Sequence, residues 1–177
     1  MVVKFNSKNI NKEKLGNKAS FLIEMTHNGF QVLNGIVLDS DTYDEIIKNN
    51  ELDEKIKKLL DKLNKNNIKN ISNKIFNLFN EIEIPNNILE EINNLIKDNK
   101  KYAVRSSGTK EDLDNYSFAG QYETFLNVNK KDISNKIIEC YKSMYSETLL
   151  SYLCNNNIVL EILFHLLYFL LILVLLQ

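Results

Sequence analysis

The sequence predicts a mixed α/β (α+β) domain, and three observations lead to this fold class. Residues 36–38 form a short β-branched apolar run, which is typical of a strand. Between about residues 50 and 100, isoleucine and leucine recur at helical spacing. Two further strands are predicted at 102–105 and 123–128. Strands on both sides of a helical middle indicate helices packed on a sheet.

The first predicted helix covers residues 19–26, because Phe21, Leu22 and Met25 fall on one helical face. Gly29 follows it at a position suited to a C-terminal cap, where a positive φ costs little. After the strand at 36–38, Thr42 and Glu45 form a capping-box pattern. We therefore expect a second helix to begin at Thr42.

Three amphipathic helices with lysine-rich outer faces are predicted between residues 50 and 100, and Pro85 separates the last from the others. We expect this helical insert to have a structural role. A stretch of loop is predicted at 106–109, after the strand at 102–105. One long helix is predicted at 132–153, because its apolar residues again recur at helical spacing.

Charge and cysteine content exclude several classes of function. The formal net charge of −1 over 177 residues gives no strong attraction to nucleic acid or to an anionic membrane. Cys140 and Cys154 have no metal-ligand spacing and are expected to be reduced thiols. Residues 1–9 are polar and carry no apolar signal segment. These features predict a cytoplasmic protein, with membrane association through residues 159–177 as the alternative.

Arg105 is the only arginine in a sequence rich in asparagine, lysine and isoleucine, and Ser106, Ser107 and Gly108 follow it. A guanidinium offers a planar fork of donors that matches phosphate oxygens. Neighbouring hydroxyls and a glycine let the backbone approach an anion closely. The alternative is a structural salt bridge between Arg105 and one of two nearby carboxylates, those of Glu111 and Asp112.

Three other residues are candidates for an anion site. Lys18 opens a helix, whose N-terminus favours anions, although the Walker-type spacing is absent. Gly120 lies in a predicted turn that returns the chain beside the arginine strand, and Thr124 follows with a hydroxyl. The alternative is a plain hairpin turn packed by aromatic residues.

Taken together, the two regions resemble a known family. Residues 16–20, continuing through Gly29 and Gly35, are similar to its Gly-Gly-Lys-Gly-Ala opening. Residues 103–107, 112–113 and 117–128 are similar to its long central signature, which is specific. The family is the pyruvate-phosphate-dikinase-like ATP-binding domain, shared by phosphoenolpyruvate synthase and rifamycin phosphotransferase. The resemblance covers about residues 10–158. Asn17 stands where the family has its second glycine.

The resemblance implies the N-terminal part of an ATP-grasp domain, in which Lys18, Arg105, Gly120 and Thr124 contact ATP. It also implies that in the complete enzyme Mg²⁺ bridges the phosphates and a mobile histidine carries the phosphoryl group to pyruvate or to an antibiotic hydroxyl. The second ATP-grasp half and the histidine domain would follow residue 158, and neither is present. No catalytic or metal-binding residue is therefore expected in this incomplete domain.

Two regions are therefore predicted, an ATP-binding portion at 1–158 and an apolar tail at 159–177 outside the family. The tail is about long enough to cross a bilayer but has no flanking lysine or arginine. We favour a frameshifted or truncated gene product over a membrane anchor or a buried core helix. The expected function is the ATP-binding part of a phosphoenolpyruvate synthase. The alternatives are a rifamycin-type phosphotransferase fragment and a non-catalytic, membrane-tethered ATP-binding remnant.

Overall fold

The computed structural model describes residues 2–8, 11, 14–108, 112–113, 116–117, 123–156 and 169–176. Its elements follow one another along the chain as β1 (Val2–Lys4), α1 (Gly16–His27), β2 (Gly35–Leu38), α2 (Ser40–Asn49), α3 (Asp53–Leu60), α4 (Ile68–Phe79), α5 (Asn86–Leu95), β3 (Lys101–Gly108), β4 (Asp112–Leu113), β5 (Tyr116–Ser117), β6 (Thr124–Asn129), the 3₁₀ helix η2 (Lys130–Asp132), α6 (Ile133–Ser143), α7 (Glu147–Asn155) and β7 (Phe169–Leu176). The predicted combination of helices and sheet is confirmed, including the three helices α3, α4 and α5 of the middle region.

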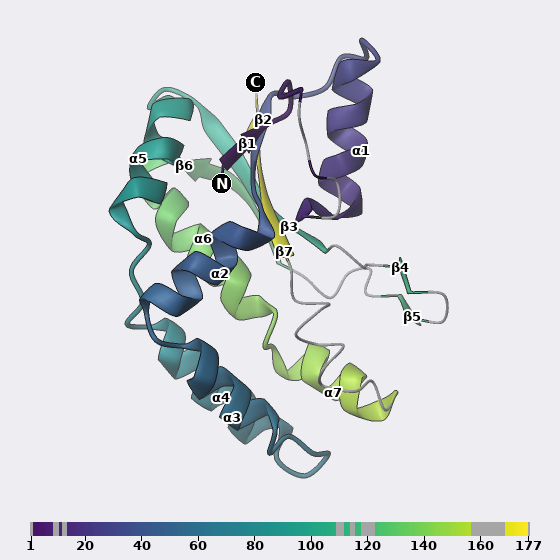
Figure 1. Cartoon of the computed structure of the whole chain (residues 1–177), viewed down its shortest axis with the longest axis vertical. Coiled ribbons are helices and arrows are strands. Elements are labelled where there is room, and N and C mark those ends of the chain that lie inside the picture. Colours follow the sequence, from purple (N-terminus) through teal and green to yellow (C-terminus); the bar gives the residue numbers. More distant parts are fainter. Residues whose placement is uncertain are drawn as a thin grey trace.

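Five strands form one sheet in the order β1-β2-β7-β3-β6, and every neighbouring pair is antiparallel. The short strands β4 and β5 pair separately. Helix α1 covers one face of the large sheet, and the remaining helices lie on its other side (Figure 1). Strand β2 separates the two cores, because Ile36 and Leu38 are buried in the larger cluster while Val37 is buried under α1.

The cap of α1 follows the sequence closely. Gly29 has φ 79°, and the amide of Phe30 donates to the Met25 carbonyl at 3.0 Å while the Gly29 amide donates to Thr26 at 3.2 Å. This pair of bonds is a Schellman motif, for which glycine is the favoured residue. The expected role of Gly29 as a C-terminal cap is confirmed.

Two helix boundaries differ from the prediction for the same physical reason, an N-cap side chain. Helix α2 begins at Ser40 rather than Thr42, because the Asp39 carboxylate accepts the Thr42 amide at 3.0 Å. The predicted helix at 132–153 is two helices, because Ser146 caps α7 by accepting the Leu149 amide at 3.3 Å.

The predicted loop at 106–109 is also wrong in its first part. Ser106, Ser107 and Gly108 continue strand β3, whereas Thr109 lies outside the described residues. The reason is the partner strand, since these three residues pair with positions 171, 170 and 169 of β7. A strand that is paired on one side over its whole length has its backbone groups satisfied there.

The apolar tail contributes the middle strand of the sheet. Strand β7 lies between β2 and β3, so that Leu173 pairs with Ile36 on one side and with Val104 on the other. The alternative of a buried core helix is therefore wrong for residues 169–176, which are extended. None of the helices within the described ranges combines the length and the hydropathy that crossing a membrane requires.

Candidate functional site

Arg105 lies on the side of the sheet that α1 covers. Tyr102 and Val104 of the same strand are buried in the larger cluster on the other side, and side chains alternate along a strand. Arg105 is half-buried, and its buried Nε atom has no hydrogen-bond partner among the residues that the structure describes. A buried donor without an acceptor costs about 1–3 kcal/mol. An oxygen atom of a ligand at this position would remove that cost.

The structural alternative for Arg105 involves Glu111 and Asp112. Glu111 and the Asp112 side chain lie outside the described part of the chain. Gly120 also lies outside it. The salt bridge of Arg105 with Glu111 or Asp112, and the role of Gly120 at the nucleotide, therefore stay predictions.

Thr124 is the direct cross-strand partner of Arg105. The two residues are opposite each other in the antiparallel pair of β3 and β6, so their side chains share one face. Thr124 is exposed, which leaves its hydroxyl accessible from the α1 side. The expectation that the chain returns beside the arginine strand is confirmed by this pairing.

A β-bulge sets the register that brings Thr124 beside Arg105. Tyr102 pairs with Val128, but Val104 pairs with Phe125, so Leu126 and Asn127 together oppose the single residue Ala103. Asn127 has φ 57°, a left-handed conformation that asparagine tolerates better than most residues. If all residues of β6 paired regularly from Val128 onward, without a bulge, Thr124 would lie opposite Ser106 and on the other face.

The N-terminus of α1 adds positive electrostatic potential on the same face. Lys18 is the third residue of α1 and is half-buried. The N-cap residue Leu15 makes no side-chain capping bond, and the first turn contains no acidic residue. The helix dipole and the Lys18 ammonium both favour an anion there. Helix α1 packs against β3 and β7, and Figure 1 shows it beginning near the end of β3.

Two local features fix the start of α1. Gly16 has φ 67°, a conformation that glycine adopts at little cost, so the helix begins directly after a sharp change in chain direction. Just before it, the Lys14 ammonium bonds the Asp41 carboxylate of α2 at 2.5 Å. The pair is exposed and contributes little to stability, but it ties the loop before α1 to α2.

The side of β3 that faces away from α1 packs against helix α6, and its cysteine is not positioned to react. Cys140 of α6 is buried, and its thiol donates weakly to the carbonyls of Val104 at 3.9 Å and Glu123 at 3.8 Å. Burial, reinforced by the Glu123 charge, raises the pKa of Cys140 from 9.0 to about 12. The thiol is therefore neutral near pH 7 and packs beneath the sheet.

The described residues do not provide a metal centre. No group of three or more His, Cys, Asp or Glu side chains within them is arranged to hold a metal ion.

The sequence suggests Lys18, Arg105 and Thr124 as candidate site residues, and the structure puts the last two side by side with α1 on the same face. The sequence did not identify Asn127, whose backbone conformation fixes the register. Asparagine tolerates a positive φ better than most residues, which is the signal that could have indicated a bulge at Asn127. Because the chain contains many asparagines, this signal does not single out Asn127.

Comparisons with known proteins show the family of this chain. Residues 12–162 match the family model described as pyruvate phosphate dikinase, AMP/ATP-binding domain. A probable phosphoenolpyruvate synthase of Methanothermobacter thermautotrophicus is 32% identical over 154 residues, which cover 80% of this chain and 22% of that protein.

Two further relatives are similar to the same region. The rifampicin phosphotransferase of Bacillus subtilis is 33% identical over 154 residues, covering 81% of this chain and 17% of that protein. The phosphoenolpyruvate synthase of Escherichia coli is 30% identical over 154 residues, covering 79% of this chain and 19% of that protein. The match thus spans about a fifth of the length of these curated relatives. The chain belongs to the pyruvate phosphate dikinase, AMP/ATP-binding domain family.

Proposed function

We propose that this chain is the ATP-binding portion of a cytoplasmic phosphotransferase of the phosphoenolpyruvate synthase type. The complete enzyme would convert ATP, pyruvate and water into phosphoenolpyruvate, AMP and phosphate. The observation that carries the proposal is the Arg105–Thr124 pair on the α1 face, with a buried Arg105 Nε that has no acceptor. Family membership supports ATP as the ligand at this position.

Each candidate residue has a defined role in this proposal. The Arg105 guanidinium donates hydrogen bonds to phosphate oxygens, and Lys18 adds a second positive charge from the first turn of α1. The Thr124 hydroxyl donates a further bond, and Gly120 lets the backbone approach the nucleotide. Fixed positive groups of this kind stabilise the negative charge that shifts between phosphate oxygens during transfer.

We propose that the chain alone binds ATP without completing the reaction. The described residues contain no carboxylate cluster for Mg²⁺. A carrier histidine and a site for pyruvate would lie in regions that correspond to the rest of the longer relatives. Binding and turnover are therefore separable measurements on this chain.

The acceptor has one specific alternative, an antibiotic hydroxyl. The relative named rifampicin phosphotransferase is as similar to this chain as the relatives named phosphoenolpyruvate synthase. Because the candidate site handles only the nucleotide, both acceptors are compatible with it. Activity assays of a complete protein with pyruvate and with a rifamycin distinguish the two.

Calorimetric titration of the purified chain with ATP, with and without Mg²⁺, tests the proposal. We expect saturable binding, which Lys18→Gln weakens by about tenfold through loss of one phosphate contact. Lys69→Gln is the matched control. Lys69 is exposed on α4, so this substitution removes the same charge far from the site. Absence of saturable ATP binding by a folded chain, or equal losses in the two variants, contradicts the proposal. Pyruvate-dependent AMP formation by the chain alone contradicts the proposal that it binds ATP without completing the reaction.

A further inference from the structure

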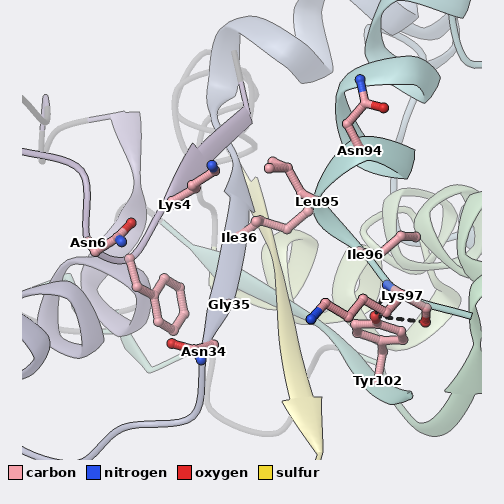
Figure 2. Close-up of a pocket in the computed structure, with 11 residues that line it drawn as sticks. Lys4, Asn6, Asn34, Gly35, Ile36, Asn94, Leu95, Ile96, Lys97 and Tyr102 are labelled. Carbon is pink, nitrogen blue, oxygen red and sulfur yellow. Dashed lines mark hydrogen bonds between the residues drawn. The ribbon is translucent and has the colours of Figure 1, made fainter. Parts of the chain in front are cut away.

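A cavity lies away from the Arg105–Thr124 pair, where strands β2 and β3 begin. Its volume is about 400 Å³, within the range of about 300–1,000 Å³ that is usual for small-molecule sites. Figure 2 shows its lining, which comes from the end of β1, the start of β2, the end of α5 and Tyr102 of β3. Residues 4–6, 34–36 and 94–102, three segments far apart in sequence, therefore build one cavity.

The polar lining of this cavity is entirely basic or neutral. Lys4 and Lys97 supply two ammonium groups, while Asn6, Asn34 and Asn94 supply carboxamides. No acidic side chain lines the cavity, although the chain has 23 acidic residues against 22 basic ones. In the described part of the chain, neither ammonium forms an ion pair with a carboxylate. In Figure 2 the Lys97 ammonium extends from the α5 side toward the start of β2.

The remaining lining is apolar and buried, which gives the cavity a floor. Phe5, Ile36 and Ile96 are among the buried hydrophobic residues of the core. These side chains expose only 3–6% of their surface, so an apolar body of a ligand would lie against a small, fixed apolar patch. A charged group joined to a flat or apolar body would use both parts of the lining.

Hydrogen bonds to backbone groups hold both walls in place without a ligand. The buried Tyr102 hydroxyl accepts the Lys97 amide at 2.6 Å and donates to the Lys97 carbonyl at 3.1 Å (Figure 2). On the facing wall, the Phe5 amide donates to the Gly35 carbonyl at 3.2 Å. The backbone of Lys97 is therefore fixed relative to β3. Lys4 and Asn6 are the chain neighbours of Phe5, whose backbone is fixed to β2.

We propose that this cavity is a second binding site, for a small organic anion that carries a phosphate or carboxylate on an apolar body. Lys4 and Lys97 hold the anionic group, the carboxamides of Asn6 and Asn34 accept or donate hydrogen bonds, and Phe5 and Ile96 contact the apolar body. The site is separate from the nucleotide site and does not depend on it. Because it joins β1, β2 and α5, an occupant also stabilises the folded chain.

Nuclear magnetic resonance titration of the ¹⁵N-labelled chain tests the site with three probes. Phenyl phosphate and benzoate each carry an anion on a flat ring, and benzyl alcohol carries the ring without charge. We expect saturable amide shifts at Gly35, Ile36, Lys97 and Tyr102 with either anion and none with benzyl alcohol. A response to phenyl phosphate alone identifies a phosphate site, and a response to benzoate alone identifies a carboxylate site. A response to benzyl alcohol of equal size contradicts the assigned chemistry.

The double variant Lys4→Gln/Lys97→Gln should bind the anionic probe at least about tenfold more weakly. Lys57→Gln/Lys58→Gln is the matched control, because it removes the same two charges from exposed positions on α3. Arg105→Gln should leave the cavity shifts unchanged, which separates this site from the nucleotide site. The proposal is overturned if the control pair loses as much affinity as the cavity pair, or if shifts follow exposed lysines over the whole surface.

Discussion

Thr124 lies directly opposite Arg105 in the antiparallel pair of β3 and β6, and a β-bulge between this pair and the Tyr102–Val128 pair sets the register. The bulge at Leu126 and Asn127 keeps Phe125 and Val128 on the core side while turning Thr124 toward α1. The same local irregularity thus serves both the packing of the sheet and the composition of the candidate site. Bulges often occur next to functional sites, where they redirect side chains.

The bulge predicts an unusual order among variants of Asn127. Asn127→Val should lower the free energy of unfolding by about 1–2 kcal/mol, because a β-branched residue disfavours the observed φ of 57°. Asn127→Gly should be tolerated. Deleting Asn127 should preserve the Arg105–Thr124 pairing, since the remaining residues then pair regularly. Urea unfolding and cross-strand nuclear Overhauser contacts between positions 105 and 124 measure both effects. Equal stability of the valine and glycine variants contradicts this role.

Three buried tyrosines predict opposite effects of the same change. The hydroxyls of Tyr43 and Tyr145 lie 2.5 Å apart in the core, so Tyr43→Phe leaves the Tyr145 hydroxyl without that partner and should cost about 1–3 kcal/mol. The Tyr141 hydroxyl is buried and has no hydrogen-bond partner in the described part of the chain, so Tyr141→Phe should be neutral or stabilising. Thermal unfolding of both variants and of the Tyr43→Phe/Tyr145→Phe pair measures these differences. Two results would contradict these hydrogen-bond assignments. One is a loss of stability in Tyr141→Phe, and the other is a stability loss in the Tyr43→Phe/Tyr145→Phe variant equal to the sum of the two single losses.

The buried thiol of Cys140 predicts a loss of stability in alkali. Burial raises the pKa of Cys140 from 9.0 to about 12. Below pH 9 both the folded and the unfolded thiol keep their proton. Between pH 9 and pH 12 only the unfolded thiol loses it, so this group's contribution to stability falls as pH rises. Cys140→Ala should reduce the slope of unfolding free energy against pH in this window, and an unchanged slope contradicts the prediction.

Thiol labelling at pH 8 gives an independent check on the same residue. Cys154 is half-buried and Cys140 is buried, so an aromatic disulfide reagent should modify Cys154 first. Cys140 should react only at the rate of unfolding. Rapid labelling of both thiols in the folded chain is the contrary result.

The middle position of β7 predicts that residues 169–176 are essential for folding. Leu173→Pro removes a backbone donor in a strand that is paired on both sides, and should abolish cooperative unfolding. Leu173→Ile keeps the backbone donor and is the control. Hydrogen exchange gives a second measurement, because amides at 172–174 should exchange more slowly than those of the edge strand β1. A Leu173→Pro chain that unfolds cooperatively like the control contradicts the central position.

Local sequence signals predicted most of the elements but not their assembly. Gly29 ended α1 as expected, because its role depends only on the conformation of its own backbone. The break at Ser146 was missed, because a capping serine inside a long apolar pattern competes with helix continuation. The insertion of β7 between β2 and β3 involves partners more than sixty residues away in sequence, and no local pattern of apolar residues specifies them.

Arg105→Lys in the 177-residue chain tests the central claim most directly. The substitution keeps the positive charge and removes the planar fork of donors, including the buried Nε. If Arg105 binds the nucleotide phosphates, calorimetry should show that ATP affinity falls by about tenfold or more, while Lys101→Arg, at the start of the same strand, binds ATP as the unmodified chain does. Unchanged ATP affinity in a folded Arg105→Lys chain would contradict the account and show that Arg105 has a structural role.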